Sequence, residues 1–219
     1  AAAIKGFSRI RFMSSHPKDI SDEVIEIMAS EPNIEKHLHL PLQSGSDRLL
    51  KIMNRPYDTE KYMHIVDNFR RLVPGGSIST DIIVGFPGET EEDFEGTMDI
   101  VRRAKFDSAF TFQYSIRPGT KAAEMEDQVP HDIVTERFGR LLKLQNDLVF
   151  ESNRAKIGKV EEVLIEGLSS TSDDILTGRT KSNHLVNFTV PDELKIPDLP
   201  LSSYEGLLCD VKFTKAKPY

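Results

Sequence analysis

The side chains best suited to contact a ligand lie in a short polar loop, Gln-Ser-Gly-Ser-Asp at residues 43–47. An alternating apolar stretch, HLHLPL, precedes this loop and predicts a strand, and a helical run follows it. Polar groups at the end of a parallel strand lie at the sheet edge where ligands bind. Gly45 lets the backbone turn tightly or approach a ligand closely. The alternative is an ordinary loop in which Ser46 or Asp47 only caps the next helix.

A second glycine-rich loop, GFPGET at residues 85–90, follows the apolar run Ile82–Val84, which predicts a strand buried on both faces. The loop lacks the Lys-Ser/Thr ending of a P-loop and the GxGxxG spacing of dinucleotide-binding loops, so it is weak evidence for phosphate binding. The six histidines show no metal-binding spacing, and no serine, histidine and carboxylate form a recognised nucleophile motif. These residues predict ligand-binding loops without a self-sufficient catalytic group.

The composition is that of an ordinary globular protein, with 219 residues, 38% of them hydrophobic, and a net charge of −7. No apolar run approaches the roughly 20 residues that span a bilayer, and residues 1–10 do not resemble a secretory signal. A single cysteine, Cys209, excludes a disulfide framework and favours a reducing, cytoplasmic location. The negative charge argues against a globally basic nucleic-acid binder but permits a local basic patch.

Strand and helix signals alternate over the first 130 residues, which predicts an α/β fold, a parallel sheet with helices outside it. Asp19 and Asp58 are expected helix caps, and Thr90 with Asp93 resembles a capping box. Strands are expected near 8–13, 37–42, 79–85 and 109–116, and helices over 19–29, 48–55, 58–72 and 90–104. The C-terminal ends of the strands should share one face that holds Ser15, Gln43, Gly85 and Arg117.

The pattern changes after Pro130, which divides the chain into two expected domains, residues 1–156 and 157–219. A long amphipathic helix is predicted from Asp132 to about Lys156. Beyond it, short strands separated by polar loops predict a small all-β barrel or sandwich, with Lys181-Ser182-Asn183 as a hairpin turn. The expected strands are 160–165, 175–180, 185–190 and 207–214.

Five blocks of the sequence carry a resemblance to one protein family. They are RFMSSHPKD (11–19), HLPLQSGSDRLLKIMNR (39–55), TDIIVGFPGETEEDF (80–94), FTFQYSIRPGTKAAEM (110–125) and LTGRTKSNHLVNF (176–188). In this order they resemble the radical S-adenosylmethionine methylthiotransferases, and LQSGSD resembles the tRNA-modifying branch more than the ribosomal-protein branch. The resemblance implies part of a radical-SAM barrel followed by a TRAM domain, a small β-barrel that grips RNA. It also implies conversion of N6-isopentenyladenosine, next to the tRNA anticodon, into its 2-methylthio derivative.

The same resemblance implies S-adenosylmethionine and two 4Fe-4S clusters as cofactors. Members of the family bind one cluster on a C-x3-C-x2-C loop and the other on three N-terminal cysteines. This chain has neither set, and Cys209 is expected to be a core residue of a small-domain strand. Cluster iron needs thiolate ligands, so the chain is expected to ligate neither cluster and to be inactive alone. It is therefore interpreted as the C-terminal part of a longer enzyme.

The family's cofactor-side positions correspond to three loops of this sequence. The resemblance implies that Gln43, Ser44 and Ser46 face the ribose and methionine parts of S-adenosylmethionine. It implies adenine contacts from Ile83, Gly85 and Phe86, and further contacts from Ser115 and Arg117. Ser14, Ser15 and His16 are candidates for contacts on the substrate side. The alternatives are that Gly85 only shapes its turn and that Arg117 only pairs with a nearby carboxylate.

The implied partner is the anticodon stem-loop of a tRNA, with a sulfur donor that the sequence does not identify, no membrane, and a monomeric protein. Residues 157–219 carry seven Lys/Arg against ten Asp/Glu, so a local patch must attract RNA phosphates. Candidate RNA-binding residues are Arg179, Lys181, His184 and Lys212, joined by Lys215 and Lys217; the alternative is a solvated basic face. Two other functions stay open. One is a non-catalytic RNA-binding module. The other is an unrelated parallel-barrel enzyme such as a lyase, which would need a lysine or metal ligands converging at the predicted strand ends, and the sequence shows none there.

Overall fold

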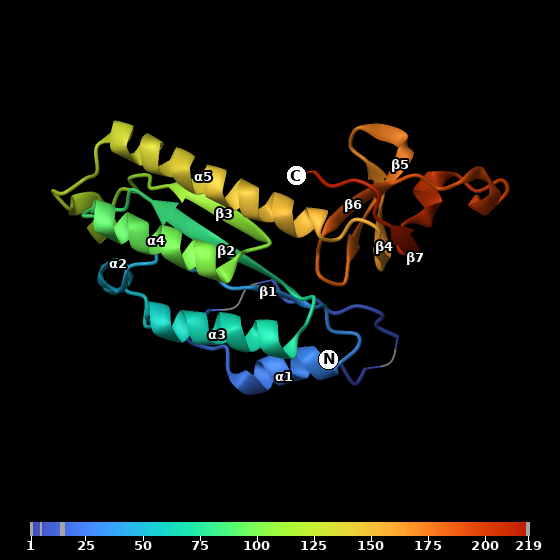
Figure 1. Cartoon of the computed structure of the whole chain (residues 1–219), viewed down its shortest axis with the longest axis horizontal. Helices are drawn as coiled ribbons and strands as arrows, with labels where there is room; N and C mark the ends of the chain where they lie inside the picture. The colour runs from blue at the N-terminus through green and yellow to red at the C-terminus, as the bar shows by residue number, and fades with distance from the viewer. Residues whose placement is uncertain (1, 5, 14–15, 218–219) are drawn as a thin grey trace.

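The computed structural model describes residues 2–4, 6–13 and 16–217, and it divides into an α/β part and a small β part joined by a long helix (Figure 1). The α/β part contains the helices α1 (Asp22–Ser30), α2 (Asp47–Ile52), α3 (Thr59–Leu72) and α4 (Glu91–Ala104), and the strands β1 (His37–His39), β2 (Ser77–Val84) and β3 (Ser108–Gln113). The long helix is α5 (His131–Arg154), and the small part contains β4 (Val160–Ser169), β5 (Ser172–Thr180), β6 (Leu185–Phe188) and β7 (Leu208–Lys212). Single 3-10 turns lie at Lys121–Glu124 (η1), Asp192–Leu194 (η2) and Leu201–Tyr204 (η3).

The first sheet has the order β1-β2-β3 with all pairs parallel, which confirms the predicted α/β class. β1 is shorter than the predicted strand 37–42, because Pro41 has no N–H to donate to the ladder. The chain nevertheless stays beside β2, since Leu40 N donates to Ser79 O and Gln43 N donates to Asp81 O, both at 2.8 Å.

The predicted strand near residues 8–13 is wrong among the residues that the structure describes. Ile10 forms only an isolated parallel bridge with Ile34, outside the sheet. The flanking arginines are held by side-chain ion pairs instead: Arg11 bonds the buried carboxylate of Glu35, and Arg9 lies 3.7 Å from the same group. Alternating residues here serve those ion pairs rather than a sheet ladder. Ser15, expected at the end of this strand, lies outside the described residues.

The helices cover one face of the sheet and leave the other face open. Alternate residues of β1 and β2, such as Leu38, Ile78 and Ile82, are completely buried with Phe69 and Phe94 of the helices. On the other face of the sheet, Phe110 and Phe112 of β3 are 58% and 52% exposed. Ile83 lies on this open face and is half-buried, whereas Ile82 and Val84 are buried on the other face. The prediction that the strand 82–84 is buried on both faces is therefore wrong.

Local capping signals define most helix starts as predicted. Asp58 accepts from Lys61 N at 2.8 Å at the start of α3. Thr90 and Asp93 form the predicted capping box of α4. The first helix starts later than predicted, because Ser21 rather than Asp19 occupies its N-cap position.

The small part is a four-stranded antiparallel sheet with the order β6-β5-β4-β7, curled as in a TRAM-like half-barrel. Its core is built from Ile165, Leu176 and Tyr204. Gly178 allows β5 to lie against β4, since a Cβ there would sit 2.4 Å from Leu164 O. The predicted small all-β barrel is confirmed as a fold class, and the predicted boundary near residue 157 lies between α5 and β4.

The turn between β5 and β6 docks on the N-terminal end of the first sheet. Its backbone oxygens accept three hydrogen bonds: Arg179 O from Arg9 at 2.7 Å, Lys181 O from Lys36 N at 2.8 Å, and Ser182 O from the Ser77 hydroxyl at 2.5 Å. We call this contact the hairpin interface. It fixes the small part at the end of the sheet opposite to the strand C-termini, as Figure 1 shows.

Asp107 places a largely buried carboxylate at the hairpin interface. Its carboxylate accepts hydrogen bonds from Ile78 N and Arg70, both at 2.9 Å, and lies 3.8 Å from the ring of His184. Burial alone would raise the pKa of Asp107, but bonding to His184, Arg70 and Ile78 N outweighs it and sets the pKa at about 2. The interface therefore depends on an ionised carboxylate.

Replacing Asp107 with asparagine should lower the free energy of unfolding by about 2 kcal/mol at pH 7. Because the folded pKa lies below the unfolded value of 3.8, the carboxylate's contribution is complete above about pH 4 and is lost as the pH falls through about 2. Urea unfolding of both proteins at pH 7 and pH 3 measures this. The exposed Asp99→Asn, whose partner is Arg102 on the same helix, should cost less than about 0.5 kcal/mol. An Asp107→Asn difference equal at both pH values would contradict the ionised role.

Candidate functional site

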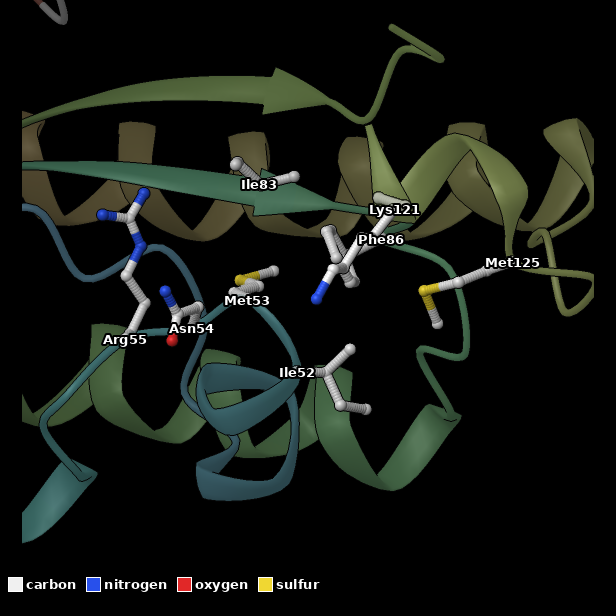
Figure 2. A pocket seen from close by; sticks show the side chains of 9 residues that line it. Ile52, Met53, Asn54, Arg55, Ile83, Phe86, Lys121 and Met125 are labelled. Atoms are coloured by element: carbon white, nitrogen blue, oxygen red, sulfur yellow. The ribbon is translucent and has the colours of Figure 1, made fainter. Parts of the chain in front are cut away.

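A pocket of about 490 Å³ opens at the C-terminal end of β2, between the end of α2 and the η1 turn. Figure 2 shows side chains from all three segments pointing into it. None of the described residues that line this pocket is acidic, so its electrostatic character is cationic and apolar. The lining residues are Ile52, Met53, Asn54, Arg55, Ile83, Phe86, Lys121, Ala122 and Met125.

Arg55 contributes a buried polar atom with incomplete bonding to this pocket. It is half-buried, and its Nε atom is buried without a hydrogen-bond partner among the described residues. Asn54, with φ of +55°, ends α2 in a left-handed conformation, after which the Arg55 guanidinium points toward β2 (Figure 2). A half-buried guanidinium without a carboxylate partner is suited to an anionic ligand group.

Tyr114 provides a second buried polar atom without a partner in the described part of the chain, its phenol oxygen. Tyr114 N donates to Val84 O at 2.8 Å, so the residue follows β3 directly beside the end of β2. Its ring packs edge-on against Phe86, with centroids 5.4 Å apart. Arg55 and Tyr114 were both missed from the sequence, because an unpaired buried polar atom has no sequence pattern.

The loop 43–47 holds α2 against α4. Gln43 adopts φ of +66° and is buried, and Ser44 is completely buried. The Ser46 hydroxyl donates to Asp93 at 2.5 Å and accepts from Leu49 N at 3.3 Å, so Ser46 is the N-cap of α2. The fold also uses the Ser44 hydroxyl, which accepts from Ser46 N at 3.2 Å.

Gly45 approaches a helix rather than open space. Gly45 N donates to the Thr97 hydroxyl of α4 at 2.8 Å. A Cβ at this position would lie 2.4 Å from Thr97 Cα and 2.5 Å from Gly96 O. The close approach at Gly45 is therefore to the backbone of α4, and an approach to a ligand stays a prediction.

Of the other predicted cofactor-side residues, Ile83 and Phe86 line the pocket with Arg55. Gly85 has φ of +79° and donates to Glu89 at 3.1 Å, and a Cβ there would collide with Val134 of α5. This glycine shapes the turn. Ser115 and Arg117 are exposed beyond β3 and do not line the pocket.

The open face of the sheet carries a chain of polar contacts. The Ser79 hydroxyl lies 2.9 Å from His37 Nε2 and 2.8 Å from His39 Nδ1, and His39 Nε2 lies 3.5 Å from the Asp81 carboxylate. Burial, with the nearby charges of His39 and Arg11, lowers the pKa of His37 to about 4. Asp81 pairs with the exposed Phe110 in register, so a carboxylate and an aromatic ring adjoin on this face. Alternation along 80–84 places Asp81 there, although it was not predicted as a site residue.

The predicted RNA-binding residues divide between two places. Arg179 and Lys181 lie 3.2 and 3.6 Å from Glu166 and Glu162, and His184 lies within the hairpin interface. Lys212 is exposed on β7. Of the substrate-side candidates, His16 packs edge-on against Tyr57, with ring centroids 5.6 Å apart, and Ser14 and Ser15 lie outside the described residues. The roles of all these residues stay predictions.

The described residues contain no group of three or more histidine, cysteine or acidic side chains placed to hold a metal ion. None of their helices has the length and apolar character of a membrane span.

Two family models match this chain in separate segments. Residues 2–101 match the Radical SAM superfamily, and residues 154–198 match the TRAM domain. The first segment contains the loop 43–47 and the strand ends that line the pocket, and the second contains most of the small sheet.

Curated relatives named tRNA-2-methylthio-N(6)-dimethylallyladenosine synthase match nearly the whole chain. The protein from Clostridium botulinum is 49% identical over 216 residues, which are 99% of this chain and 46% of the relative. The protein from Carboxydothermus hydrogenoformans is 48% identical over 214 residues, which are 98% of this chain and 46% of the relative. The chain thus spans about half the length of the curated relatives it matches.

Among solved structures, coproporphyrinogen III oxidase from Escherichia coli, described as a radical SAM enzyme, is similar in fold. The match has a TM-score of 0.53 and 14% identity, and covers 80% of this chain and 50% of that one. At this identity the likeness concerns the fold alone.

Proposed function

Because this chain belongs to the radical SAM superfamily and carries a TRAM domain, we propose that it acts within a tRNA methylthiotransferase. The proposed reaction converts N6-isopentenyladenosine next to the anticodon into its 2-methylthio derivative. The predicted resemblance to this family is confirmed by relatives of matching name over nearly the whole chain. The cationic, apolar pocket at the strand ends is the observation in the structure that best supports the proposal.

The pocket suits S-adenosylmethionine, which has a carboxylate, an aromatic base and a ribose. Arg55 would bind the carboxylate, since its guanidinium has no acidic partner among the described residues. Ile83 and Phe86 would pack against the adenine, and the phenol of Tyr114 would bond a polar atom of the ligand. We keep Gln43 and Ser44 as candidates for the ribose and methionine side.

The remaining predicted residues would act around this group. Ser46 would hold the loop in place through Asp93 and α2. Gly85, with its positive φ, would form the turn that leaves the C-terminal end of β2 accessible to the ligand. Ser115 and Arg117 would approach the ligand from the exposed segment after β3.

When bound beside a 4Fe-4S cluster, S-adenosylmethionine would supply radical chemistry through its reductive cleavage. The residues of this chain would orient the molecule and shield its adenine from water. Cys209 is half-buried on β7, where burial raises the pKa of its thiol, so it is poorly suited to ligate iron as a thiolate. We propose that neither of the two clusters is held by this chain.

The test is anaerobic reconstitution of the complete protein with iron, sulfide and S-adenosylmethionine, followed by nucleoside analysis of a tRNA that contains N6-isopentenyladenosine. The 2-methylthio nucleoside is expected. Transfer to a ribosomal protein instead would place the enzyme in the other branch, and RNA binding without any product would favour a non-catalytic module. The 219-residue chain alone should give neither product nor iron–sulfur absorption.

A further inference from the structure

Charge is strongly segregated within and next to the small domain. Residues 161–207 contain three Lys/Arg against nine Asp/Glu. The flanking segments 150–160 and 208–217 together contain six Lys/Arg against two Asp/Glu. A polyanion would be repelled by the first set and attracted by the second.

The fold brings these two basic segments together. Val160 and Lys212 are paired in the register of β4 and β7. Phe213 N donates to Lys159 O at 2.9 Å, and Asn153 donates to Lys217 O at 3.0 Å. Figure 1 shows the C-terminal tail beside the end of α5. We call this surface the terminal basic face; it comprises Arg154, Lys159, Lys212, Lys215 and Lys217.

The side chains of the terminal basic face are available to a partner. None of the five forms an ion pair within the described part of the chain, and all five are exposed. The cations of the β5–β6 hairpin differ, because Arg179 and Lys181 lie beside Glu166 and Glu162. Their turn is also docked on the first sheet through its backbone.

Apolar side chains are interleaved with the cations. Phe150 is exposed at 38%, with the Arg154 guanidinium 5.7 Å from its ring centroid. Ile157 and Val160 are exposed at 48% and 58%. Cations that neutralise phosphates, next to rings and alkyl groups that can pack against bases or sugars, suit RNA better than a free anion.

We propose that the terminal basic face, rather than the β5–β6 hairpin, is the surface by which this protein holds the phosphates of its RNA. The proposal rests on the proposed function and specifies its RNA contact. The helix α5 begins beside the ligand pocket, where Val134 faces Gly85, and ends at this face. Its 24 residues span about 36 Å. RNA bound at both places must therefore be an extended structure, such as a stem-loop, and not a mononucleotide.

The test measures binding of the 219-residue chain to a fluorescent anticodon stem-loop RNA at several salt concentrations. Lys159→Gln with Lys212→Gln should weaken binding roughly tenfold or more near 100 mM salt and reduce the salt slope by about 1.5–2. Lys181→Gln at the hairpin and Lys143→Gln on α5, an exposed lysine paired with Asp147, are the matched controls and should stay within about twofold of the wild type. Thermal unfolding checks that all variants keep the fold.

The outcomes separate this inference from the proposed function. If the wild type binds and only Lys181→Gln weakens it, the hairpin is the contact and the inference is overturned, while an RNA-directed function stands. If the double variant binds as tightly as the wild type, the inference is likewise overturned. A wild-type chain that retains no RNA near 50 mM salt would overturn both this assignment and the RNA-gripping role of the small domain.

Discussion

Replacing Gly45 with alanine is expected to lower the free energy of unfolding by about 3 kcal/mol or more. The added methyl would lie 2.4 Å from Thr97 Cα and 2.5 Å from Gly96 O. Both atoms belong to the backbone of α4, which cannot move aside as a flexible side chain could. The loop and α2 would have to shift, which would also strain the hydrogen bond from Gly45 N to the Thr97 hydroxyl. Chemical denaturation followed by circular dichroism measures the loss.

The matched control is Gly139→Ala in α5. A Cβ there meets no atom within 4 Å, and the residue is exposed in the middle of α5. This substitution should raise the free energy of unfolding by about 0.5–1 kcal/mol, because alanine loses less backbone entropy than glycine. If both substitutions changed stability equally, the close approach of the loop to α4 would be wrong.

Replacing Arg55 with methionine in the complete protein should weaken S-adenosylmethionine binding roughly 100-fold, as expected for losing a charge-assisted bond to a carboxylate. Stability should change by less than about 1 kcal/mol, since the side chain's Nε has no hydrogen-bond partner among the described residues. Equilibrium dialysis with the cluster-loaded protein measures the affinity directly. The affinity for tRNA should stay unchanged, because the proposed RNA surface lies at the other end of α5.

Arg103→Met is the control for Arg55→Met, since Arg103 is exposed in the last turn of α4. It should leave the affinity for S-adenosylmethionine within about twofold of the wild type, as is usual for a surface charge outside the site. An Arg55 variant that binds S-adenosylmethionine normally would show that the pocket serves another group. If the variant lost both ligands together with its stability, the residue would be structural.

Short-range signals were the most predictable part of the fold. A cap is decided by a side chain and backbone groups only three residues away, so Asp58 and the Thr90–Asp93 box could be identified from spacing alone. The buried alternation of residues 37–42 likewise fixed which side chains face the helices. Prediction from local pattern failed at residues 8–13. The alternation there resembles a strand, but Arg9 and Arg11 alternate because both form ion pairs with Glu35.

The ligand pocket could be predicted only in part, for a geometrical reason. Ile83 and Phe86 follow a recognisable strand, whereas Arg55 reaches the same place from the end of a helix. What distinguishes Arg55 is that no carboxylate of the described residues pairs with it, which is a property of three-dimensional surroundings and has no sequence pattern. The same holds for the hairpin: Arg179 and Lys181 resemble free cations in the sequence, but long-range folding places Glu162 and Glu166 beside them.

The hairpin interface has a consequence for how this sequence can diverge. All three of its hydrogen bonds from the first domain end on backbone oxygens of the turn, at residues 179, 181 and 182. A backbone oxygen persists through almost any substitution, so homologues can drift at these positions while the docking geometry is inherited unchanged. The donor side is different, because Arg9 and Ser77 contribute side chains. Selection that maintains the orientation of the two domains should therefore act on the donors far more strongly than on the turn that they hold.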